Sequence, residues 1–124
     1  MKKIITTDKA PAPIGPYNQA VLLGNLLYTS GQIAINPTTG ELALENISTE
    51  TKQVMENLKA VLAASEMTFE NVIKTSIFIS DMHNFGEINE IYGNREYIGQ
   101  DQFSSFLLHS WCCSQQECIW HYFQ

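Results

Sequence analysis

Residues 48–62, STETKQVMENLKAVL, and residues 72–80, VIKTSIFIS, decide the fold because their apolar residues follow two different periods. The first stretch begins at Ser48, a candidate N-cap, and has the three-and-four spacing of an amphipathic helix. The second stretch alternates, which is typical of a strand with one face more buried than the other. We expect the buried positions to be Val54, Met55, Leu58, Val61 and Leu62 in the helix, and Ile73, Thr75, Ile77 and Ile79 in the strand.

The flanking segments extend this pattern in both directions. Gly24-Asn25 separates two apolar runs, 21–23 and 26–28, which predicts a β-hairpin. Asn36-Pro37-Thr38-Thr39-Gly40 predicts a turn that ends a strand beginning near Ser30. Helical spacing returns over residues 85–92. The order of strands, helix, strand and helix predicts an α+β or α/β protein with helices on one face of a mixed sheet.

Length and charge exclude several classes of protein. The chain has 124 residues, of which 44% are apolar and 16% charged, and these values are typical of one globular domain. Thirteen acidic residues against seven basic ones give a net charge of −6, and Arg95 is the only arginine, so we expect no nucleic-acid partner. No window reaches the ~20 apolar residues of a membrane span, and the amino terminus does not resemble a secretory signal. We therefore expect a cytoplasmic protein without a membrane partner.

The composition changes at residue 94. Residues 94–124 contain all three cysteines, both tryptophans and no lysine, valine, alanine, threonine or proline. Their only β-branched residues are Ile98 and Ile119, so this segment does not continue the strand pattern and fits neither helix nor strand well. We interpret the chain as one domain, 1–124, whose residues 94–124 are either divergent or the product of a frameshift.

Five short motifs occur in order along the first three-quarters of the chain. They are 12–17, APIGPY; 28–33, YTSGQI; 36–40, NPTTG; 74–79, KTSIFI; and 88–92, INEIY. Together these motifs resemble the reactive intermediate deaminase (Rid) family, also called the RutC or endoribonuclease L-PSP family. The resemblance implies an α+β, chorismate-mutase-like fold and a homotrimer with ligand pockets between subunits. It also implies hydrolysis of 2-aminoacrylate or 2-iminobutanoate to 2-oxo acids and ammonia, in threonine and isoleucine metabolism, without a cofactor.

The resemblance also implies a set of substrate-binding residues. Tyr17 and Ser30 would line the pocket, Gly31 would bring main-chain N–H groups close, and Asn89 would present its amide from the second helix. Taken without the resemblance, Tyr17 is a turn tyrosine, Ser30-Gly31 is a possible β-bulge, and Asn89 lies on a solvated helix face.

One part of the family pattern is missing. The family binds the substrate carboxylate through the arginine of a Pro-Ala-Arg motif, and counting in register from Asn89 puts Phe106 at that position. Arg95 lies eleven positions earlier, and we do not assign it this role. Reading the gene one nucleotide later allows Phe-Pro-Ala at 103–105, which is compatible with a frameshift. The alternative function is therefore a non-enzymatic, metabolite-binding regulator of isoleucine biosynthesis. Ribonuclease activity rests only on an older family label.

We predict no metal site. Zinc is usually bound by thiolates and imidazoles, but the spacing in this chain is poor, because two cysteines are adjacent and no Cys-x2-Cys pair occurs. Reduced thiols are the simpler expectation. His83 follows the predicted strand and receives no role. The candidate ligands considered are His109, Cys112, Cys113, Cys118 and His121.

Overall fold

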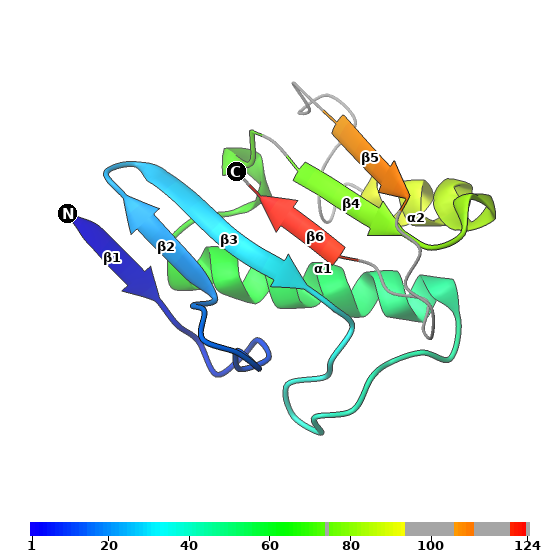
Figure 1. Ribbon diagram of the computed structural model, residues 1–124, viewed down its shortest axis with the longest axis horizontal. Coiled ribbons are helices and arrows are strands. Elements are labelled where there is room, and N and C mark those ends of the chain that lie inside the picture. Colours follow the sequence, from blue (N-terminus) through cyan, green and yellow to red (C-terminus); the bar gives the residue numbers. More distant parts are fainter. Residues whose placement is uncertain (74, 94–105, 111–119, 124) are drawn as a thin grey trace.

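The computed structural model describes residues 1–73, 75–93, 106–110 and 120–123 (Figure 1). These residues form one sheet, two α-helices and two short 3-10 helices. The strands are β1 (Lys2–Ile5), β2 (Ala20–Leu23), β3 (Leu26–Gln32), β4 (Thr75–Ile79), β5 (Phe106–Ser110) and β6 (Trp120–Phe123). The helices are α1 (Ile47–Ala64), α2 (Phe85–Tyr92), η1 (Phe69–Asn71) and η2 (Met82–Asn84).

The sheet is mixed, with the order β1-β2-β3-β6-β4-β5. Strands β4 and β5 pair in parallel, and the other neighbours are antiparallel. Both helices lie on the same side of the sheet, where the core residues of α1, α2, β3 and β4 meet (Figure 1). This arrangement confirms the predicted α+β class with helices on one face of a mixed sheet.

Helix α1 confirms the predicted helical spacing but starts earlier than expected. Its five predicted apolar residues are all buried. The N-cap is Asn46, whose extended backbone lets the side-chain Oδ1 accept a hydrogen bond from the Thr49 N–H at 2.8 Å. Ser48 was the wrong choice of cap because it lies within the first turn, where its hydroxyl donates to Glu87 Oε1 of α2 at 2.7 Å.

Strand β4 confirms most of the predicted alternation. Thr75, Ile77 and Ile79 are buried, but the prediction for Ile73 is wrong, since 57% of that residue is exposed. The reason is that β4 begins at Thr75, so the alternating pattern starts two residues before the strand does. Tyr92 of α2 is fully buried beside Thr75, and burial raises the pKa of Tyr92 against the opposing effect of the Thr75 hydroxyl.

The predicted hairpin and turn are both present. Gly24, between β2 and β3, has a φ of 61°, the left-handed region that a tight hairpin turn requires. The Gly40 N–H donates to the Asn36 carbonyl at 2.8 Å and closes the second turn. No strand begins near Ser30, however, because β3 runs without interruption from Leu26 to Gln32.

The segment from residue 94 onward contains two strands that its composition did not predict. Strand β6 lies between β3 and β4, and β5 pairs with β4 so that Phe106 is opposite Thr75. Sheet ladders are made by main-chain N–H and C=O groups, so any segment without proline can complete them. Residues 106–110 and 120–123 contain no proline. Arg95 and the three cysteines lie outside the described residues.

Among the residues that the structure describes, no helix is both long and apolar enough to cross a membrane.

Candidate functional site

Ser30 is held against the loop that precedes β2. Its hydroxyl donates a hydrogen bond to the Asn18 carbonyl, and its main-chain N–H donates to the Gln19 carbonyl at 2.9 Å. The hydroxyl proton is therefore used within the chain, and the oxygen lone pairs remain able to accept a hydrogen bond. Because Asn18 directly follows Tyr17, these two bonds bring Tyr17 and Ser30 into one neighbourhood although they are thirteen positions apart.

Gly31 follows Ser30 at an irregularity in the sheet. Thr29 is opposite Phe123 and Gln32 is opposite His121, so the pairing between β3 and β6 shifts register across residues 30 and 31. This is the β-bulge that sequence analysis considered as the simple alternative. Bulges frequently lie beside binding sites because they redirect side chains and free main-chain groups from the ladder. The bulge is thus compatible with a binding role as well as with a purely structural one.

Tyr17 ends an exposed loop with a tight local fold. Its hydroxyl accepts a hydrogen bond from the Ile14 N–H at 3.4 Å, and its own N–H donates to the Gly15 carbonyl at 2.8 Å. A Cβ atom on Gly15 would lie 3.2 Å from Tyr17 Cε1, so a larger residue there would require the ring to shift by a few tenths of an ångström. Within the described residues no acceptor takes the Tyr17 hydroxyl proton, which is therefore able to donate, and 47% of the residue is exposed.

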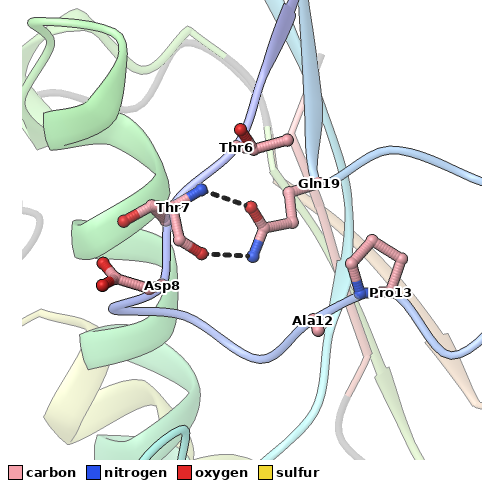
Figure 2. Close-up of a pocket in the computed structure, with 6 residues that line it drawn as sticks. All are labelled: Thr6, Thr7, Asp8, Ala12, Pro13 and Gln19. Atoms are coloured by element: carbon pink, nitrogen blue, oxygen red, sulfur yellow. Dashed lines mark hydrogen bonds between the residues drawn. The ribbon is translucent and has the colours of Figure 1, made fainter.

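A hollow of about 470 Å³ opens beside this loop (Figure 2). Asp8 carries the only charge among its lining residues, which makes this hollow a poor binding site for an anion. The hollow does not include Tyr17, Ser30 or Gly31 and is separate from the candidate site. It is lined by Thr6, Thr7, Asp8, Ala12, Pro13 and Gln19.

Two buried carboxamides, which sequence analysis missed, fix the chain on either side of Ser30-Gly31. Gln19 bonds to the main chain of Thr7, as Figure 2 shows, and also to the carbonyls of Ala10 and Pro11. Asn57 of α1 donates to the carbonyls of Ile33 and Ile35 at 3.0 and 2.9 Å, while its Oδ1 accepts from Gln53. Their partners are main-chain atoms distant in sequence. No motif could therefore have identified these roles.

Asn89 lies on a different element from the other candidate residues. It is exposed on α2, next to the buried residue Ile88, and its main-chain carbonyl accepts the Gly93 N–H at 2.9 Å. The structure of one chain thus brings together Tyr17, Ser30 and Gly31 and leaves Asn89 on a separate helix. The assignment of these four residues to one binding site stays a prediction.

His83 and Asp81 form an exposed pair between β4 and α2. His83 Nδ1 lies 2.8 Å from Asp81 Oδ1, which also accepts the His83 N–H at 2.9 Å. The main-chain bond is the larger cause that lowers the pKa of Asp81. Within the described part of the chain, no three His, Cys, Asp or Glu residues come close enough to hold a metal ion.

Comparison with known proteins identifies the family. The family model for endoribonuclease L-PSP matches residues 7–115. The chain belongs to the endoribonuclease L-PSP family, also called the RutC or Rid family. A RutC family protein of Pyrococcus horikoshii is 45% identical over 102 residues, which are 82% of this chain and 79% of the relative.

Two further members of this family carry information about small molecules. A mouse protein named 2-iminobutanoate/2-iminopropanoate deaminase is 45% identical over 92 residues, or 74% of this chain and 68% of the relative. A crystal structure of the Escherichia coli protein TdcF with bound serine matches with a TM-score of 0.85 and 29% identity. That match covers 98% of this chain and 95% of the TdcF chain. The L-PSP family resemblance seen in the sequence is therefore confirmed.

Proposed function

We propose that this chain is an imine and enamine deaminase that hydrolyses 2-iminobutanoate and 2-aminoacrylate to 2-oxo acids and ammonia. The observation that carries the proposal is the neighbourhood of Tyr17 and Ser30, with one free hydroxyl proton and one free acceptor oxygen. The 45% identity to a mouse deaminase of this name supports it. We expect this activity in the cytoplasm.

The two hydroxyls suit the hydrolysis of a small 2-imino acid. An enamine first takes a proton on its Cβ and becomes the imine. Water then adds its oxygen to the C=N carbon and one proton to the nitrogen, which gives a carbinolamine. The carbinolamine hydroxyl gives its proton to the nitrogen as the C–N bond breaks and the C=O bond forms, so that ammonia leaves and the 2-oxo acid remains. Tyr17 would donate its proton to a ligand oxygen, and Ser30 would accept a hydrogen bond from the attacking water or the imine N–H. Gly31 would offer main-chain N–H groups, and Asn89 would add its amide. No cofactor is proposed.

We also propose that the protein is a homotrimer. Cross-strand partners Ile4, Val21 and Tyr28 form an apolar row on the sheet face away from the helices. Ile4 and Tyr28 are 51% and 45% exposed, and Leu23 and Leu26 extend the same face. Such a face supports association with further copies of the chain, because large exposed apolar patches mark interaction sites.

We infer further that the reading frame changes near residue 94. The support is the altered composition of residues 94–124 and the presence of Phe106 where the family has its carboxylate-binding arginine. Loss of that cation removes charge-assisted hydrogen bonds of about 1.5–3 kcal/mol each. Sequencing the gene across codons 90–124 tests this inference. An inserted or deleted base near codon 94 is the expected result, and an unbroken reading frame contradicts the inference.

A coupled assay tests the deaminase proposal. A threonine dehydratase supplies 2-iminobutanoate, and the release of 2-oxobutanoate is followed with and without the chain. Acceleration that falls at least about tenfold in Tyr17→Phe and Ser30→Ala supports the proposal. Equal rates with and without folded protein contradict it.

The regulator proposal is favoured by one observation, the uncharged Phe106 at the arginine position. Titration calorimetry with 2-oxobutanoate, threonine and isoleucine distinguishes it from catalysis. Saturable binding without any acceleration of hydrolysis supports a regulator. Turnover, or no binding of any of the three compounds, contradicts it.

A further inference from the structure

The side chain of Gln19 makes four hydrogen bonds to one short stretch of main chain. Its Oε1 accepts the Thr7 N–H at 2.6 Å. Its Nε2 donates to the carbonyls of Thr7, Ala10 and Pro11 at 2.9, 3.3 and 2.9 Å. Figure 2 shows the oxygen and the nitrogen of the carboxamide facing the main-chain nitrogen and oxygen of Thr7. Only 3% of Gln19 is exposed, so water does not compete for these bonds.

The main chain of the same residue holds Ser30. The Gln19 carbonyl accepts the Ser30 N–H at 2.9 Å, and the neighbouring Asn18 carbonyl accepts the Ser30 hydroxyl. Gln19 therefore connects three parts of the molecule: residues 7–11, the bulge in β3, and Tyr17, which lies two positions before it.

Burial does not fix the loop that carries Tyr17. Residues 12–18 are all exposed, and the hydrogen bonds of Tyr17 described above join it only to Ile14 and Gly15 inside the same loop. Such a loop can move as a unit unless its ends are anchored. Gln19 anchors both ends, since it bonds Pro11 on one side and follows Asn18 directly on the other.

We propose that Gln19 is a positioning residue that fixes the Tyr17 hydroxyl relative to Ser30. Its effect on ligands rests on the proposed function, whereas its effect on the loop does not. A carboxamide is required because one planar group must offer an acceptor to the Thr7 N–H and two donor protons, which the three carbonyls share, the 3.3 Å contact with Ala10 being the longest. A carboxylate would face three carbonyl oxygens without a proton to share, and a thioether would make none of the bonds.

Two variants test the chemistry at nearly constant side-chain length. Gln19→Met removes all four bonds, and Gln19→Glu keeps only the acceptor for the Thr7 N–H. The matched control is Asn71→Leu, because Asn71 is a carboxamide on η1 whose Oδ1 accepts the Thr68 N–H at 2.9 Å, a bond that involves neither the loop nor β3.

Amide hydrogen exchange on the full chain is the first measurement. In Gln19→Met we expect exchange of residues 7–19 and of the Ser30 amide to accelerate roughly tenfold to a hundredfold, with α1 unchanged. Gln19→Glu should behave similarly at neutral pH. Exchange that stays the same at residues 7–19, or that rises equally throughout α1 and the sheet, overturns the proposal.

The second measurement is the affinity for 2-oxobutanoate, determined by calorimetry. We expect Gln19→Met to weaken binding about fivefold or more, while Asn71→Leu leaves the dissociation constant unchanged. Unchanged affinity despite a loosened loop overturns the positioning role. If the unaltered chain does not bind 2-oxobutanoate, the proposed function fails at that point, and the exchange measurement alone decides whether Gln19 orders the loop.

Discussion

Ser30 and Asn18 are joined by a hydrogen bond from the Ser30 hydroxyl to the Asn18 carbonyl. This bond ties the bulge of β3 to the loop that presents Tyr17, and so it connects the two hydroxyl groups on which the proposed chemistry depends.

Replacing Ser30 by alanine should reduce both stability and binding. Ser30→Ala removes one hydrogen bond and should lower the free energy of unfolding by about 1 kcal/mol, measured by urea denaturation. Ser65→Ala is the control, because the Ser65 hydroxyl also donates to a main-chain carbonyl, that of Val61 at 3.3 Å. Both variants should lose similar stability, but only Ser30→Ala should weaken 2-oxobutanoate binding. Weakened binding in Ser65→Ala as well would show that the loss is not local.

Glu66 follows Ser65, the C-cap of α1, and has a φ of 58°, which places it in the left-handed region. A side chain in this conformation costs roughly 1 kcal/mol, and glycine does not pay it. We expect Glu66→Gly to raise the free energy of unfolding by about 0.5–1 kcal/mol. Lys59→Gly, at an exposed position inside α1, should lower it by about 1 kcal/mol. A destabilised Glu66→Gly variant would show that the carboxylate makes a contact worth more than the strain.

The Thr29 hydroxyl is buried and has no hydrogen-bond partner in the described part of the chain. Valine has nearly the same shape and removes the unpaired polar atom. We expect Thr29→Val to be neutral or to stabilise the protein by about 1 kcal/mol in chemical denaturation. Thr51→Val serves as a contrast, because the Thr51 hydroxyl donates to the Ile47 carbonyl at 2.7 Å. A loss of more than about 1 kcal/mol in Thr29→Val would reveal a partner for the hydroxyl.

Burial raises the pKa of Tyr92, and this predicts a dependence of stability on alkaline pH. In the unfolded chain, tyrosine ionises near pH 10, whereas the folded chain keeps the Tyr92 proton. The unfolded state therefore binds fewer protons above pH ~10, and stability falls by up to ~1.4 kcal/mol per pH unit there. Below pH ~10, Tyr92 keeps its proton in both the folded and the unfolded state, so it does not make stability depend on pH.

The variant Tyr92→Phe isolates this contribution. Its free energy of unfolding, measured between pH 8 and 11, should fall less steeply above pH 10 than that of the unaltered chain, by the slope of one proton. Identical slopes in the two proteins would mean that Tyr92 reaches solvent and ionises in the folded state.

The elements that were predicted well are those whose side chains face one common core. The spacing of Val54, Leu58 and Val61 is a direct consequence of helical geometry, so the sequence alone was sufficient for α1. The cap was misplaced because Asn46 and Ser48 are both good N-caps, and only the backbone conformation distinguishes them. Ile73 was misjudged because an alternating pattern does not mark where a strand begins.

The candidate site stays a prediction, and the structure adds to it a residue that no motif indicates. The resemblance drew attention to Tyr17, Ser30 and Gly31, and the structure places them together. Gln19 was missed because its partners are the main-chain atoms of Thr7, Ala10 and Pro11, which carry no sequence signal. The strands β5 and β6 were missed because pairing in a ladder depends on the backbone rather than on β-branched side chains.

The central position of β6 in the sheet also determines when the sheet can be completed during translation. Strands β3 and β4 are synthesised before β6. The edge of each strand that pairs with β6 therefore stays unpaired until residues 120–123 have been made. Once β4 has been made, the growing polypeptide thus carries two open hydrogen-bonding edges, and the sheet closes between β3 and β4 only after residues 120–123 follow. A frameshift in the part of the gene that encodes these residues would therefore alter a central strand of the sheet rather than an edge strand.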